Sequence, residues 1–143
     1  MYTSNEFPIP YKNNFNILSV NHTSSDSLIM HFGTHIIMDF FQCDIAKLND
    51  MEFVEKELIR AATTAGAHVL GKQFHRFSPH GVTGILSLQE SHLSIHTWPE
   101  HKFAAADFFS CGNIKAEIAY EILSSSLAAR ERKIKKIKRG ESD

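Results

Sequence analysis

Cysteine is scarce in this 143-residue chain, and the two that occur, Cys43 and Cys111, are too few for a disulfide framework. Their scarcity favours a reducing compartment. The chain has no apolar run of membrane-spanning length, and its amino terminus lacks the basic segment followed by an apolar one that marks a secretory signal. We therefore expect a cytoplasmic location, and the length favours one globular domain.

Net charge is also nearly absent, at −1, but the charges are unevenly placed. Seven of the fifteen Lys and Arg residues fall within residues 130–139, which leaves residues 1–129 with eight basic and thirteen acidic residues. We expect this basic tail to be a solvated helix or edge strand. Binding to nucleic acid or anionic lipid is the alternative, and we do not expect either as a partner.

The hydrophobic pattern predicts one strand and one helix in the first half of the chain. Residues 1–30 read as a polar extension with one short strand at 15–20. Residues 34–43 have the β-branched and aromatic content of a buried strand. Residues 50–65 change to helical spacing, with Asn49 followed by Glu52 as a candidate capping box.

The second half predicts four strands and a second helix. The strands are expected at residues 68–77, 82–88, 92–98 and 103–110, and Asn113 is expected to cap the helix that follows. This order gives an α+β fold in which a mostly antiparallel sheet carries helices on one face. Because two helices cannot cover both faces, we expect the free faces of two copies to pack together as an αββα sandwich.

Residues 89–112 are the part of the chain richest in reactive groups, and they read QESHLSIHTWPEHKFAAADFFSCG. The pair Glu90-Ser91 and the segment HLSIHTWPE, with FHRFSPHGVTG before them and DFFSCG after them, resemble the prokaryotic S-adenosylmethionine decarboxylase proenzymes. The resemblance covers residues 33–129. It implies a decarboxylase domain at 31–129 that cuts itself between 90 and 91; the polar extension at 1–30 and the basic tail at 130–143 lie outside the matched residues.

The resemblance implies that this chain makes its own cofactor. The hydroxyl of Ser91 would attack the carbonyl of Glu90, and elimination of the resulting ester would leave a pyruvoyl group at residue 91. By resemblance His96 removes the Cα proton for that elimination, and Thr83 assists the processing through its hydroxyl. No pyridoxal phosphate and no metal are required.

The same resemblance implies the decarboxylation of S-adenosylmethionine, which supplies aminopropyl groups for spermidine synthesis. The pyruvoyl carbonyl would form a Schiff base with the substrate and accept the electrons released with CO₂. Cys111 would then donate a proton to the product. Phe77 and Trp98 match positions that stack on the adenine ring, and Glu100 matches the acid that binds the ribose hydroxyls; packing alone is the alternative for the two aromatic residues.

Two rival functions remain open. The scaffold could serve another amino acid such as ornithine or arginine, although Phe77, Trp98 and Glu100 favour a nucleoside substrate. The chain could also be an unprocessed, non-enzymatic partner of a polyamine enzyme.

His92 and His96 have the spacing of a helical zinc pair, but they lie in a strand-like segment, so we do not expect a metal site there.

Strand alternation raises a geometric difficulty, because it places Ser91 on the opposite face from His96. We therefore expect the backbone to bend or bulge near residues 90–92, so that residue 91 reaches the face that carries His96 and Cys111.

Overall fold

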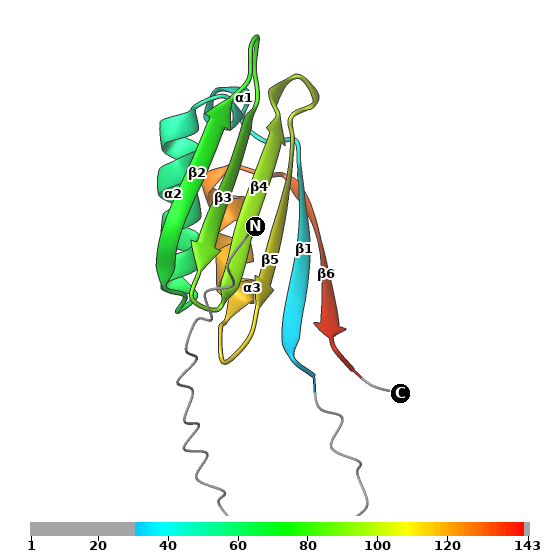
Figure 1. Cartoon of the computed structure of the whole chain (residues 1–143). Helices are drawn as coiled ribbons and strands as arrows, with labels where there is room; N and C mark the ends of the chain where they lie inside the picture. Colours follow the sequence, from blue (N-terminus) through cyan, green and yellow to red (C-terminus); the bar gives the residue numbers. More distant parts are fainter. Residues whose placement is uncertain (1–30, 142–143) are drawn as a thin grey trace, which may run out of the picture.

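A single six-stranded sheet forms the frame of the molecule in the computed structural model, which describes residues 31–141 (Figure 1). The spatial order is β2-β3-β4-β5-β1-β6, and every neighbouring pair is antiparallel. The strands are β1 (Gly33–Phe41), β2 (Val69–Arg76), β3 (Val82–Leu88), β4 (Ser91–Trp98), β5 (Phe103–Ser110) and β6 (Glu131–Arg139). The expected antiparallel sheet is thus confirmed, and the strand proposed at residues 15–20 lies outside the described residues.

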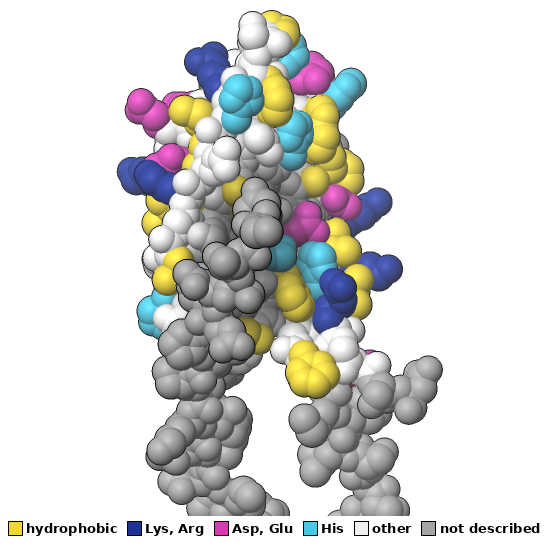
Figure 2. Space-filling model, in the orientation of Figure 1, with side chains coloured by type: hydrophobic (Ala, Val, Ile, Leu, Met, Phe, Trp, Pro, Cys, Tyr) yellow, Lys and Arg dark blue, Asp and Glu magenta, His cyan; other side chains and the backbone are white. Residues whose placement is uncertain are grey.

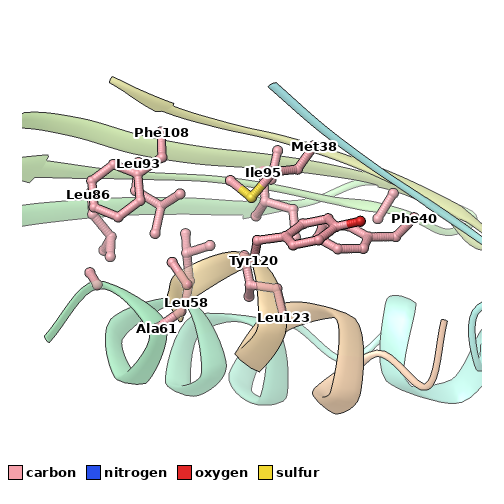
Figure 3. Packing of buried hydrophobic residues seen from close by; sticks show 14 of the residues in the cluster. Met38, Phe40, Leu58, Ala61, Leu86, Leu93, Ile95, Phe108, Tyr120 and Leu123 are labelled. Carbon is pink, nitrogen blue, oxygen red and sulfur yellow. The ribbon is translucent and has the colours of Figure 1, made fainter. Parts of the chain in front are cut away.

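The helices α2 (Met51–Thr64) and α3 (Ala116–Ser126) lie side by side on one face of this sheet, behind it in Figure 1. Their apolar stripes pack onto alternate residues of the strands, and Figure 3 shows these side chains between the two layers. Leu58 of α2 and Leu123 of α3 are almost completely buried there, as is Phe108 of β5. Burial of this apolar layer is the main stabilising contribution to the fold.

Both helix caps inferred from the sequence are wrong. The carboxylate of Asp50, not Asn49, caps α2 by accepting the backbone N–H of Phe53. Asn49 instead ends a one-turn helix, α1 (Ile45–Leu48), and its side-chain oxygen accepts the N–H of Gly81. The second helix begins two residues later than expected, because Lys115 and not Asn113 occupies the cap position, and no side chain caps it.

The basic tail is an edge strand. β6 pairs with β1 along its whole length, and two of its basic residues reach down to α3. Arg132 forms an ion pair with Glu121 at 2.6 Å, and Lys136 forms one with Glu117 at 2.6 Å. β6 is rich in lysine, and lysine at an exposed sheet edge commonly prevents that edge from pairing with other chains.

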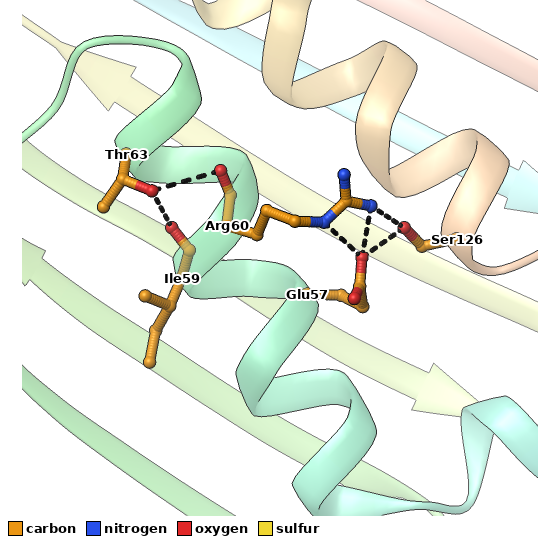
Figure 4. A network of polar contacts seen from close by, with 5 residues as sticks. All are labelled: Glu57, Ile59, Arg60, Thr63 and Ser126. Carbon is orange, nitrogen blue, oxygen red and sulfur yellow. Dashed lines mark hydrogen bonds and ion pairs between the residues drawn. The ribbon is translucent and has the colours of Figure 1, made fainter.

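A polar network joins the two long helices within the apolar layer (Figure 4). The carboxylate of Glu57 accepts hydrogen bonds from Arg60 at 2.9 and 2.5 Å and from the Ser126 hydroxyl at 2.5 Å. Burial of Glu57 opposes its ionisation, but these hydrogen bonds and the charge of Arg60 outweigh burial and lower its pKa. The ionised carboxylate therefore links α2 to the end of α3.

The opposite face of the sheet carries no helix in residues 31–141. Histidine and hydrophobic side chains lie beside one another on it, as Figure 2 shows. Among the described residues, no helix is long and apolar enough to cross a membrane.

Candidate functional site

The residues singled out from the sequence gather at two ends of the open sheet face. In β4, Leu93, Ile95 and Thr97 are buried beneath the helices, so the residues that alternate with them face the open side. The aromatic end contains Phe77, His96, Trp98 and Phe103, with Thr83 beside His96. The cleavage end contains Glu90, Ser91, His92 and Cys111.

At the cleavage end, a two-residue turn formed by Gln89 and Glu90 connects β3 to β4. The Glu90 carbonyl oxygen accepts the backbone N–H of Cys111 at 3.0 Å and the Cys111 thiol at 3.3 Å. These two donors polarise the carbonyl and would stabilise negative charge on its oxygen during nucleophilic attack. The arrangement follows from the sheet, because Ser91 pairs with Ser110, the residue that precedes Cys111.

The side chain of Glu90 is fixed as firmly as its carbonyl. One carboxylate oxygen accepts the backbone N–H of His68 at 3.0 Å, and the other lies 2.6 Å from Nδ1 of the His68 ring. Desolvation opposes ionisation of Glu90, but the hydrogen bonds from the side chain and backbone of His68 outweigh it and lower the Glu90 pKa. His68 thereby anchors the residue that precedes the predicted cleavage point.

Ser91 has an unusual backbone torsion. Its φ is 142°, a region that residues other than glycine rarely adopt and that costs free energy. A backbone distortion was expected at residues 90–92, but this one does not bring Ser91 to His96. The Oγ of Ser91 lies 3.1 Å from Nδ1 of His92.

At the aromatic end, ring packing orders the side chains around His96. Its ring centroid lies 4.2 Å from that of Trp98 and 5.5 Å from that of Phe77, and Trp98 stacks on Phe103 at 5.3 Å. Thr83 is the direct cross-strand neighbour of His96. These contacts leave Phe77 40% exposed, so its ring can still meet a ligand.

Glu100 lies just beyond this end, in the single turn η1 (Pro99–His101) that follows β4. Its carboxylate is 3.1 Å from Nε2 of His80 and remains accessible to solvent. A hollow of about 290 Å³ opens beside Thr83 and His75. That volume is at the lower limit of small-molecule sites, and two larger surface hollows contain none of the predicted site residues.

The two ends are too far apart to react within one chain. β4 is regularly paired from Ser91 to Trp98, so the five residue steps from Ser91 to His96 span roughly 16 Å at the usual strand rise of about 3.3 Å. The structure therefore brings Cys111 to the Glu90 carbonyl, and His96 together with Thr83, Phe77 and Trp98. It does not bring Ser91 to His96.

Three features of the cleavage end escaped the sequence reasoning. The backbone N–H of Cys111 carries no side-chain signal, and His68 lies far from Glu90 in the sequence. His92 could have been found only by knowing that Ser91 breaks the strand alternation.

The described residues contain no group of three or more His, Cys, Asp or Glu side chains arranged to hold a metal ion.

The two thiols occupy different environments. Cys111 is exposed at the cleavage end, whereas Cys43 is buried in the core. Burial raises the pKa of the Cys43 thiol to about 11. Of the two thiols, only that of Cys111 is exposed to solvent.

The fold and the open face place the chain in a class of two-layer α+β proteins. Its sheet is antiparallel, and one face of that sheet carries the candidate active-site groups. The family model for S-adenosylmethionine decarboxylase matches residues 34–140, which include β6. The chain therefore belongs to the S-adenosylmethionine decarboxylase family.

Individual relatives agree with this assignment. An S-adenosylmethionine decarboxylase proenzyme from Anoxybacillus flavithermus is 42% identical over 108 residues, which cover 76% of this chain and 87% of the relative. One from Prochlorococcus marinus is 47% identical over 108 residues, covering 75% and 86%. The crystal structure of the adenosylmethionine decarboxylase from Aquifex aeolicus superposes with a TM-score of 0.74 at 32% identity, covering 79% of this chain and 94% of that one.

Proposed function

We propose that this chain is a proenzyme that cuts itself between Glu90 and Ser91 and then decarboxylates S-adenosylmethionine. The product, decarboxylated S-adenosylmethionine, donates aminopropyl groups for spermidine synthesis. The observation that carries the proposal is the Glu90 carbonyl, which accepts two hydrogen bonds from Cys111 directly before a serine with a strained backbone.

The proposed cleavage starts from two neighbouring groups, the Ser91 hydroxyl and the Glu90 carbonyl. Ser91 Oγ forms a bond to the Glu90 carbonyl carbon as the amide C–N bond breaks, which gives an ester and a free amine at residue 91. Removal of the Cα proton then expels the Glu90 carboxylate and leaves a dehydroalanine, which hydrolyses to the pyruvoyl group with loss of ammonia. The strain at Ser91 favours the forward direction, because cleavage releases its φ of 142°.

Residue 91 is suitably placed to carry a pyruvoyl group. It is half-buried at the start of β4, directly after the Glu90 carbonyl that Cys111 contacts, and its side chain lies beside the ring of His92. The pyruvoyl carbonyl supplies an electron sink that is bound covalently to the substrate amine. Cys111 delivers a proton to the substrate carbon that has lost CO₂, since its thiol lies against the Glu90 carbonyl at the same point.

The aromatic end would hold the nucleoside. Phe77 and Trp98 offer ring faces to the adenine, and Glu100 offers a carboxylate to the ribose hydroxyls. Thr83 and His96, which are cross-strand neighbours, serve the processing: His96 takes the Cα proton of residue 91, and Thr83 supplies a hydroxyl hydrogen bond.

These roles require two copies of the chain. Within one chain, roughly 16 Å separates Ser91 from His96, as the strand rise requires. If two open faces pack about a two-fold axis, the cleavage end of one copy can meet the aromatic end of its partner. The resulting homodimer is an αββα sandwich with two equivalent sites, and it also covers the exposed aromatic residues.

Intact-mass analysis of freshly purified protein tests the processing. We expect two chains, 1–90 and 91–143, with a ketone on residue 91 that reacts with a hydrazide. Release of labelled CO₂ should then occur with S-adenosylmethionine and not with ornithine or arginine. A stable uncut chain would contradict the proposal and favour a non-enzymatic partner, whereas CO₂ release from ornithine or arginine alone would assign another substrate.

A further inference from the structure

We propose that His92 is the base that removes the hydroxyl proton of Ser91 when the chain cuts itself. This inference rests on the proposed function and adds a catalytic residue to it. His96 is assigned to a later proton, on the Cα of residue 91, which leaves the first proton transfer without a base.

The geometry of His92 suits that first transfer. Its Nδ1 lies 3.1 Å from Ser91 Oγ, which is hydrogen-bonding distance. In a regular strand, neighbouring side chains point to opposite faces, so this contact depends on the φ of 142° at Ser91. The bend that strains the scissile bond therefore also brings the nucleophile to its base.

The imidazole is held in place by its neighbours. His92 pairs with Ser87 on β3 and with Phe109 on β5, and the rings of His92 and Phe109 lie 5.9 Å apart. The ring is half-buried, so its rotation is restricted while Nε2 can still carry a proton. With the proton on Nε2, the Ser91 hydroxyl donates its hydrogen bond to Nδ1.

His92 takes up one proton and later returns it. Nδ1 accepts the Oγ proton as the bond from Oγ to the Glu90 carbonyl carbon forms, while Cys111 stabilises the charge on the carbonyl oxygen. The same proton then passes from Nδ1 to the departing amide nitrogen as the C–N bond breaks. His92 ends neutral, and no other reactant is consumed.

His92 and His96 therefore act at successive steps. His92, from the same chain as Ser91, promotes ester formation. His96 is required for elimination of that ester. Variants of the two residues should consequently stop the reaction at different species.

Hydroxylamine distinguishes these species, because it cleaves an accumulated ester and leaves a serine amino terminus and a hydroxamate on Glu90. The variant His96→Ala should form the ester and be cut by hydroxylamine between 90 and 91. The variant His92→Asn should form the ester about 10²-fold more slowly than the unmodified chain, consistent with the loss of a general base, and hydroxylamine should not cut it. His101→Asn, at an exposed turn, is the matched control and should be processed normally.

A change of nucleophile at residue 91 distinguishes a general base at His92 from a residue that only supports the structure. In a Ser91→Cys background, the more acidic thiol needs less help from a base, so His92→Asn should slow thioester formation far less than it slows ester formation. Should His92→Asn lose its circular dichroism spectrum, His92→Gln carries the same expectations.

Processing of His92→Asn at the unmodified rate, or an ester in His92→Asn that hydroxylamine cuts, would overturn the assignment. So would an equal loss in the serine and cysteine backgrounds. If instead the unmodified chain and His101→Asn both remain uncut, the proposed function itself fails.

Discussion

The two cysteines differ in burial, and we expect them to differ in reactivity for that reason. Cys43 is 3% exposed, and desolvation of its thiolate raises its pKa to about 11. Cys111 is exposed, and its thiol donates to the Glu90 carbonyl at the point where cleavage is proposed. Reactivity towards electrophiles should therefore differ sharply between them.

Thiol labelling tests this difference. Treatment of the native Ser91→Ala chain with iodoacetamide at pH 7.5 should modify Cys111 and leave Cys43 unmodified, because a thiol with a pKa of about 11 has a negligible thiolate fraction at that pH. Peptide mass analysis gives the site of modification. In 6 M guanidinium both thiols should react, as should Cys43 in an unfolded Cys111→Ser control; native labelling of Cys43 would contradict its burial.

The elements of the helical layer are joined by a charged network as well as by apolar contacts. Glu57 is nearly buried between α2 and α3, and its pKa is lowered because the hydrogen bonds from Arg60 and Ser126 outweigh its desolvation. A carboxylate whose pKa is lower in the folded state stabilises that state above its unfolded pKa. The stabilisation is lost as the pH falls through the folded value.

Replacement of Glu57 by Gln should lower the free energy of unfolding by about 1.5–3 kcal/mol at pH 7, the range for hydrogen bonds to a charged group. Urea titration of the uncut Ser91→Ala background measures it on a single chain. The difference between the two chains should shrink as the pH is lowered below about 4.3, where the unfolded carboxyl is protonated. Glu55→Gln, which breaks a more exposed pair with Lys72, should cost only about 0–1 kcal/mol; an equal loss from both would refute a special role for Glu57.

Local pattern predicted the strands better than the helix caps. β3 and β5 begin and end where their alternation indicates, because one of their faces is buried and the other is open. The caps failed because Asn49 and Asp50 are adjacent residues with similar capping ability, and only the fold decides that Asn49 bonds to Gly81. The role of β6 was undecidable for a related reason: its lysines suit a helix surface as well as a sheet edge.

The site was harder to predict because it depends on pairing between distant strands. Residues that share a strand, such as His96 and Trp98, could be assigned to one face by alternation. The hydrogen bonds from Cys111 to Glu90 follow from the register of β4 and β5, and the sequence does not specify that register. The contact between Ser91 and His92 required an exception to alternation at one residue.

At the scale of the whole molecule, the proposed dimer makes processing an event between two chains. Co-expression of Ser91→Ala and His96→Ala chains tests this directly. Each variant alone should remain uncut. In a mixed dimer, the intact Ser91 of the His96→Ala chain meets the intact His96 of its partner, so about half of the His96→Ala chains should be cut if the subunits pair at random.

Intact masses identify which chain is cut, because the two substitutions differ in mass. A co-expressed pair of Ser91→Ala and His92→Asn provides the contrast, because His92 acts on its own chain and should not be complemented. Absence of cleavage in the first mixture, despite formation of mixed dimers, would place His96 in the same subunit as its target.

The strand order has a consequence for what the cut leaves behind. Cleavage after Glu90 would assign β1, β2 and β3 to one fragment and β4, β5 and β6 to the other. In the sheet these fragments alternate, because β1 lies between β5 and β6. Neither fragment can leave without breaking backbone pairing on more than one side. After such a cut, the backbone hydrogen bonds between the alternating strands would hold the two fragments together, so the cleaved subunit would remain one folding unit made of two polypeptides.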